Sequence, residues 1–148
     1  MKKPVLILSA LILSVGISAQ DSGNLISQLK SDDAATAVSA ANSLGRSKDA
    51  SAVNPLIDAA KSHPSFKVRA AAAAALGNME AKPNLSSALK GIIETDKNNA
   101  VVYSALVAIF NLKDFSNKDA LKAVEYCEKN KMDDVFIKDI IGKIRKAM

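Results

Sequence analysis

An internal repeat constrains the fold of this chain more than any other feature of its sequence. The motif A-A-x-x-L-G-x-x occurs twice, ending first in Leu44-Gly45 and again in Leu76-Gly77. A period of about 30 to 40 residues without strand patterns is typical of stacked helix pairs. Apolar residues continue this pattern toward the C-terminus in three series, and within each series the spacing is the same and close to that of the motif. The series are Val68, Val102 and Phe136; Ala72, Leu106 and Ile140; and Leu76, Phe110 and Ile144.

Each repeat divides into two helices, and residues that typically begin, end or kink helices support these divisions. The predicted pairs are 24–30 with 33–44, 50–61 with 66–79, 84–94 with 99–112, and 118–129 with 134–147. Gly45 and Gly77 are placed for C-terminal caps, Pro83 for a first turn, and Pro55 for a kink in an outer helix. The predicted N-terminal caps are Ser31, Asp32, Ser65, Asn98 or Asn99, Ser116 and Asp133. We therefore predict an all-α fold, an α-solenoid of about four stacked antiparallel helix pairs.

The amino-acid composition supports this fold class and limits the classes of partner that the chain is expected to bind. The 148 residues suit one domain, and 49% hydrophobic residues with 4% aromatics and no Trp are typical of helical proteins rich in alanine and leucine. The net charge of +5 falls to +3 when Lys2 and Lys3 are removed with a leader. Because no long run of Lys or Arg is present, we expect no nucleic-acid partner.

The N-terminal segment 1–19, "MKKPVLILSALILSVGISA", has the pattern of a secretory signal peptide. Two lysines precede a short apolar core, and Ile17-Ser18-Ala19 offers a cleavage site before Gln20. The apolar core is shorter than the roughly 20 residues of a membrane span. We predict cleavage, a domain over 20–148 with no stable membrane span, and export to the periplasm or outside a bacterial cell; the alternative is an uncleaved signal anchor.

The segment "DASAVNPLIDAAKSHPSFKVRAAAAAALGNM", residues 49–79, resembles a HEAT repeat of the PBS-lyase HEAT-like kind. Residues 25–45 resemble a truncated unit, and the last two units fit by spacing and apolar pattern alone. The resemblance implies a scaffold fold but does not transfer the activity of the phycobilin lyases that carry such repeats. The residues that match the family pattern are Asp49, Ala52-Val53, Pro55-Leu56, Val68-Arg69, Ala72-Ala73 and Ala75-Leu76-Gly77.

The same family often places an acidic residue in the turn before Val-Arg, where it and the Arg form a ladder across repeats. Here that turn is Ser62-His63-Pro64-Ser65, and in the third unit Tyr103 replaces the Arg. We therefore expect an interrupted ladder.

Few residues offer catalytic or metal-binding chemistry. His63 is the only histidine, and beside Pro64 it is interpreted as an exposed turn residue rather than a ligand or a triad base. The aspartate pairs 32–33 and 133–134 suit helix starts better than acid–base work. The segment 96–99 lacks the spacing of a calcium loop. Cys127, the only cysteine, is interpreted as a buried apolar residue, with an intermolecular disulfide as the alternative. We expect no cofactor and no metal.

We predict the partner-binding surface from the strip of the fourth helix that lies opposite its core-facing residues. Lys67, Ala70 and Ala74 lie on that strip, and Arg69 either bridges repeats or contacts a partner. Adding the same period extends the strip to Val101, Ser104, Ala108, Val135, Lys138, Gly142 and Arg145. The candidate partner-binding residues are Lys67, Arg69, Ser104, Lys138 and Arg145.

Together these features favour a non-catalytic exported scaffold that binds a protein or peptide on its concave surface. The alternative is an accessory subunit of an envelope enzyme or a lyase-like activity by family analogy. The six alanines from Ala70 to Ala75 then have a physical role, because small residues allow close packing of a helix with neighbours on three sides.

Overall fold

The computed structural model describes residues 19–80 and 83–148, and within these ranges every regular element is a helix. The predicted helix bounds hold to within a turn, except that α1 begins at Ala19 rather than at residue 24. The predicted leader lies outside the described residues apart from Ala19. The elements are α1 (Ala19–Gln28), α2 (Ala34–Ser47), the 3-10 turn η1 (Ala50–Ala52), α3 (Val53–Ser62), α4 (Phe66–Leu76), α5 (Pro83–Thr95), α6 (Asn99–Leu112), α7 (Lys118–Asn130) and α8 (Val135–Ala147).

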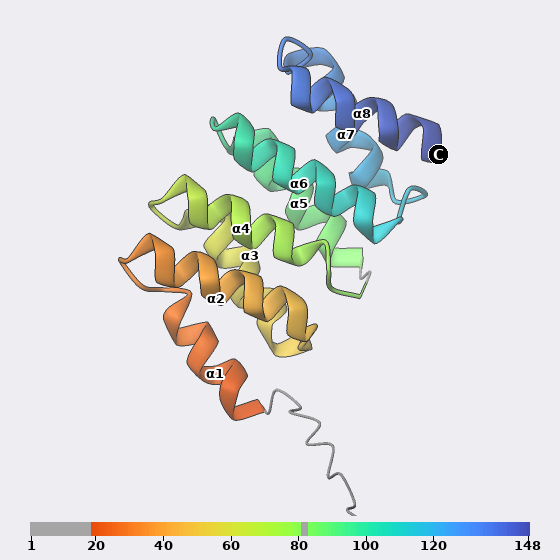
Figure 1. The fold of residues 1–148 in the computed structure, drawn as a ribbon. Coiled ribbons are helices and arrows are strands. Elements are labelled where there is room, and N and C mark those ends of the chain that lie inside the picture. The colour runs from red at the N-terminus through yellow and green to blue at the C-terminus, as the bar shows by residue number, and fades with distance from the viewer. Residues whose placement is uncertain (1–18, 81–82) are drawn as a thin grey trace, which may run out of the picture.

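The helices form two layers (Figure 1). The second helices of the pairs, α2, α4, α6 and α8, pack side by side in chain order and face the viewer. Helices α3, α5 and α7 lie behind them, and α1 contacts α2 and η1 at the N-terminal end. The predicted α-solenoid is confirmed. We call the outward side of α2, α4, α6 and α8 the second-layer face.

The alanine run of α4 lies where helices surround it. Helix α4 contacts α2, α6 and α3, the helix of its own pair. Ala72 and Ala73 are fully buried and Ala75 is 3% exposed, whereas Ala70 and Ala74 are half-buried on the second-layer face. Small side chains allow α4 to approach three helices at once, as the sequence predicts.

Ala72→Leu is expected to destabilise the protein by about 1–3 kcal/mol, because the larger side chain would overpack a site with no free surface. Ala70→Ser is expected to change stability by less than about 0.5 kcal/mol, because this half-buried position resembles a surface site. Urea unfolding of the two variants tests the prediction. Equal stabilities would contradict the assigned orientation of α4.

The prediction of a C-terminal cap is wrong for Gly45, whereas Gly77 is the C-terminal cap of α4 and has right-handed rather than left-handed geometry. Gly45 lies inside α2, Gly77 has φ −68°, and no described glycine has a positive φ. A Cβ on Gly45 would lie 2.9 Å from Ala75 Cβ, and a Cβ on Gly77 would lie 2.6 Å from Ala108 Cα. Both glycines are therefore explained by the close approach of neighbouring helices. The left-handed residues after α2 and α6 are Lys48 and Lys113.

Side chains cap several helix N-termini, in three cases one residue beyond the predicted position. Asp33 caps α2, Asn117 caps α7 and Asp134 caps α8, rather than Asp32, Ser116 and Asp133. Asn98 caps α6 as predicted, whereas Ser65 stands at the start of α4 without a capping hydrogen bond from its side chain. The predicted kink at Pro55 is unnecessary, because this residue lies in the first turn of α3, where a missing N–H breaks no helical bond.

The repeat is unequal, which corrects the strip derived from a constant period. The N-cap residues of the second helices are Asp33, Ser65, Asn98 and Asp134, and the interval between them increases along the chain. Val101 and Ala108 are consequently fully buried rather than exposed. In α8 the side chain of Phe136 is 70% exposed, and Ile137 takes the buried position.

Candidate functional site

Polar side chains connect each helix pair to the next along one edge of the stack. We call this the turn edge; it comprises the four short turns at residues 29–33, 63–65, 96–98 and 131–134. His63 Nε2 lies 3.3 Å from the Ser31 carbonyl oxygen, and Arg69 pairs with Asp96 at 2.7 Å. Asn99 Nδ2 donates to Asp134 Oδ2 at 2.9 Å. Each junction between pairs therefore contains at least one polar contact.

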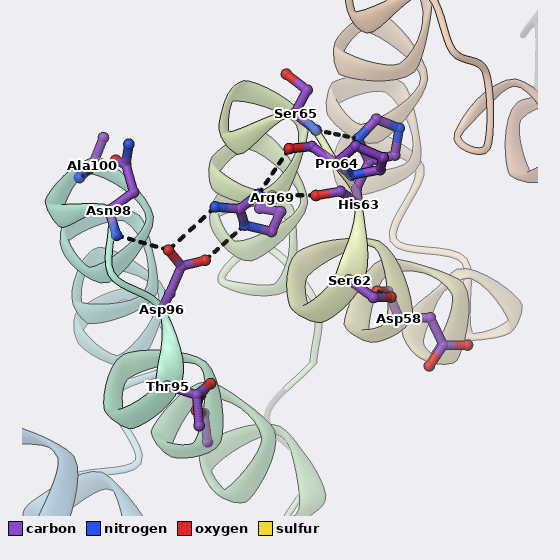
Figure 2. A network of polar contacts seen from close by, with 11 residues as sticks. Asp58, Ser62, His63, Pro64, Ser65, Arg69, Thr95, Asp96, Asn98 and Ala100 are labelled. Atoms are coloured by element: carbon purple, nitrogen blue, oxygen red, sulfur yellow. Dashed lines mark hydrogen bonds and ion pairs between the residues drawn. The ribbon is translucent and has the colours of Figure 1, made fainter.

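The centre of the turn edge is a guanidinium with contacts in two repeats (Figure 2). Arg69 Nε and Nη2 donate to the two carboxylate oxygens of Asp96 at 2.7 and 3.3 Å. Nη1 donates to the carbonyl oxygens of His63 at 2.9 Å and Pro64 at 3.1 Å. The planar fork of arginine suits such multiple acceptors. The predicted interruption of the ladder is wrong at this junction, because the aspartate directly after α5 reaches back to the arginine of the preceding repeat.

Asp96 is held in its ionised form. Its side chain is 8% exposed, and burial alone would raise its pKa. The hydrogen bonds from Arg69 and from the Asn98 N–H, together with the charge of Arg69, outweigh burial and lower the pKa. The carboxylate therefore serves as a structural anion rather than as a proton donor at neutral pH.

His63 is half-buried and hydrogen-bonded, so the expectation of an exposed turn residue is wrong. The Ser65 N–H can only donate, so Nδ1 accepts its hydrogen at 3.1 Å. Nε2 then carries the ring proton and donates to the Ser31 carbonyl. This second bond connects the first two helix pairs.

Three grooves open along the turn edge between successive pairs. The largest, about 570 Å³, lies between the turn at 62–64 and the turn at 95–98, with Arg69 and Asp96 in its wall. A groove of about 310 Å³ lies between the first two pairs, and one of about 280 Å³ lies between the last two. Within the described residues, no group of three or more His, Cys, Asp or Glu side chains could hold a metal ion.

The predicted partner-binding residues divide into two groups in the structure. Lys67 and Lys138 are exposed, and Ser104 is half-buried, all on second-layer helices. Arg69 is committed to Asp96, and Arg145 forms a two-pronged pair with Glu128 at 2.8 and 2.7 Å. Both arginines are therefore engaged in ion pairs within the fold, Arg69 with the turn after α5 and Arg145 with α7.

Sequence reasoning missed an aromatic cluster at the C-terminal end of the second-layer face. Tyr103 of α6 and Phe136 of α8 pack edge to face, with ring centroids 6.2 Å apart. Both line the groove of about 280 Å³, and the neighbouring Val135 is 74% exposed. A constant period places Phe136 in the core. The last repeat is longer than that period, and this difference in length is why Phe136 is exposed.

Cys127 is fully buried, which confirms its assignment as a buried apolar residue. Burial raises the pKa of its thiol to about 11. We expect the folded protein to resist thiol reagents at mildly alkaline pH, because both access and thiolate are lacking. Reaction with a chromogenic disulfide reagent should be complete only after denaturation in guanidinium chloride; rapid reaction of the native protein would contradict the burial of α7.

The described helices include none that is both long and apolar enough to cross a membrane.

Comparisons with known proteins agree with this geometry. A family model described as HEAT repeats matches residues 24–109. A chain from the complex of CpcE and CpcF of phycocyanin lyase from Nostoc sp. PCC7120 is similar in structure, with a TM-score of 0.69 and 20% sequence identity. The match covers 87% of this chain and 82% of that chain. At this identity the likeness shows the fold alone. Among curated proteins, no sequence matches the chain.

Proposed function

The chain belongs to the HEAT-repeat family, and we propose that it acts as a non-catalytic exported scaffold that binds a protein or peptide partner. The binding surface is the second-layer face, centred on the aromatic cluster of Tyr103 and Phe136 with Val135 next to it in α8. Repeat proteins of stacked helices present extended faces of this kind to their partners.

The exposure of this cluster is the observation that carries the proposal. Val135 is 74% exposed and Phe136 is 70% exposed, although adjacent apolar side chains of this size are stabilised by burial. Phe136 packs against Tyr103, and both residues line a groove of about 280 Å³. Aromatic side chains in or near pockets dominate the binding energy of many interfaces. A partner side chain seated in this groove would cover the exposed rings.

The rest of the second-layer face suits close approach by a partner. Ala70, Ala74 and Ser104 are small and half-buried, so they leave the helix backbones near the surface. Lys67 and Lys138 are exposed on the same layer and add positive charge. Charges at the rim of an interface set its orientation and association rate more than its affinity.

A pull-down from the cell envelope with defined variants tests the binding surface. The protein is expected to recover a discrete partner, and Phe136→Ser and Lys138→Glu should each reduce its recovery. Lys122→Glu, a matched charge reversal on α7 in the other layer, should not. Arg145 is unsuitable for this test, because its reversal would also oppose Glu128. A partner retained equally by all variants would reject this face.

Export is supported by the sequence pattern of residues 1–19. The mass of the protein isolated from cells provides the test. Cleavage at the predicted site would yield a chain that begins at Gln20, found in the periplasmic or external fraction. An intact N-terminus in the cytoplasmic fraction would refute export while leaving the binding proposal open to its own test.

An accessory role within an enzyme is the second candidate, favoured by the likeness to a lyase structure that contains two different subunits. Under this alternative, the partner recovered through the second-layer face would be an enzyme subunit whose activity depends on the present chain. Assay of that partner with and without the chain separates the two functions. A lyase-like activity of the chain itself would instead appear as turnover without that partner.

A further inference from the structure

A groove between α1 and α3 lies at the N-terminal end of the stack, at the far end from the aromatic cluster. Its volume is about 310 Å³, and its walls come from α1, from α3 and from the turn that follows each of them. Ile26, Leu29, Pro55 and Ala59 provide an apolar lining. Leu29 is 2% exposed, whereas Ile26, Pro55 and Ala59 are half-buried and accessible from the groove.

The groove lies where two successive first helices of the pairs, α1 and α3, pack less closely than α5 and α7 do. Helix α1 has 10 residues and contacts mainly α2 and η1, whereas α7 has 13 residues and packs directly on α5. Helix α7 therefore covers the apolar side of α5, whereas α1 leaves the apolar side of α3 partly uncovered. Pro55, which has no N–H to satisfy, contributes a flat apolar surface to this uncovered side.

The rim of the groove is acidic. Asp32 lies on one wall and Asp58 on the other, and both are exposed. None of the ion pairs in the described part of the chain involves either carboxylate. Lys30 also lines the groove, so two carboxylates face one ammonium group. The field at the mouth therefore favours a cation beside the apolar lining.

We propose that the groove between α1 and α3 binds a short peptide segment in which a large apolar side chain stands next to a lysine or arginine. Ligand pockets range from about 300 to 1,000 Å³, so 310 Å³ suits one large side chain rather than a cofactor. The apolar side chain would enter between Ile26 and Ala59, and the cation would lie between Asp32 and Asp58. This site is separate from the second-layer face, and either can fail without the other.

Selection of phage-displayed peptides on the purified protein, isolated intact from cells, tests the proposal. Enriched peptides are expected to share an apolar residue adjacent to Lys or Arg. Fluorescence anisotropy with the most enriched peptide then measures affinity for four variants. Asp58→Lys is expected to weaken binding about tenfold by placing like charge at the mouth. Ala59→Trp is expected to weaken it at least about tenfold by filling the groove.

Asp133→Lys is the matched control, because it makes the same charge change on an exposed aspartate at the turn before α8. It should leave affinity within about twofold, since charges beyond a Debye length are screened. Circular dichroism verifies that each variant is folded. If Ala59→Trp does not fold, the affinity of Asp58→Lys alone tests the proposal. Failure to enrich any peptide, enrichment of acidic peptides, or equal weakening by Asp133→Lys would overturn the proposal. Phe136→Ser should leave this binding unchanged, which distinguishes the groove from the second-layer face.

Discussion

Gly77→Ala is expected to destabilise the protein by about 3 kcal/mol, at the upper end of the range for overpacking. The added Cβ would lie 2.6 Å from Ala108 Cα and 3.0 Å from Ala108 Cβ. Backbone atoms of α6 cannot rotate away as a flexible side chain can, so the two helices must separate. Gly45→Ala should have a smaller effect, because the approach there is less close: 2.9 Å to the Ala75 Cβ and 3.0 Å to the Ala75 Cα. The free energy of unfolding in urea measures both effects.

Two other glycines provide matched controls. Gly91 in α5 and Gly142 in α8 lie inside helices, and a Cβ at either would meet no atom within 4 Å. Alanine at these positions is expected to stabilise the protein by about 0.5–1 kcal/mol, because it restricts the unfolded chain and favours the helix. Loss of stability in all four variants would show that close approach of helices does not explain Gly45 and Gly77.

Arg69→Met is expected to destabilise the protein by about 2–3 kcal/mol, somewhat less than the loss for a fully buried pair. The substitution leaves the Asp96 carboxylate, which is 8% exposed, without its counter-ion, and frees the carbonyl oxygens of His63 and Pro64. Arg69→Lys should recover only part of the lost stability, because one ammonium group cannot reach both the Asp96 carboxylate and the carbonyl oxygens of His63 and Pro64. Thermal and urea unfolding provide the measurement.

The pair also predicts a pH dependence with a definite sign. The pKa of Asp96 is lower in the folded protein than its ordinary value, so the unfolded chain binds the proton more tightly. The resulting stabilisation is present above the unfolded pKa and is lost as pH falls through the folded pKa. Asp96→Asn should therefore reduce the loss of stability in acid, and the double variant with Arg69→Met should be more stable than the sum of the single effects implies. Additive effects would contradict the pairing.

The fold could be predicted from sequence because its information is local and repeated. Apolar spacing, the alanine run and caps such as Asn98 each specify a helix independently of distant contacts. The exact register between repeats was less accessible, because the interval between successive second helices depends on turn and helix lengths that change along the chain. That drift moved Val101 into the core and Phe136 out of it.

The roles of Gly77 and Arg69 depended on contacts that sequence spacing does not contain. A glycine after a helical leucine has the same local pattern whether or not a neighbouring helix approaches it, and only the position of Ala108 reveals the close approach at Gly77. Similarly, the partner of Arg69 lies 27 residues away, after α5 rather than in the turn before the arginine itself. The half-buried setting of His63 follows from its contact with a carbonyl 32 residues earlier.

The placement of polar contacts at the turn edge has a mechanical consequence. Contacts at residues 63, 96 and 99 fix the distances between successive pairs along this edge. At the opposite ends of the helices, the side-chain hydrogen bond from Ser86 to Asp114 at 3.2 Å joins α5 to the loop after α6, within the third pair. We expect the stack to be stiff at the turn edge and more compliant at the other, so that elastic bending changes its curvature by spreading the compliant edge. A partner longer than the second-layer face could then be accommodated by a change in superhelical pitch, with the contact between Arg69 and Asp96 intact.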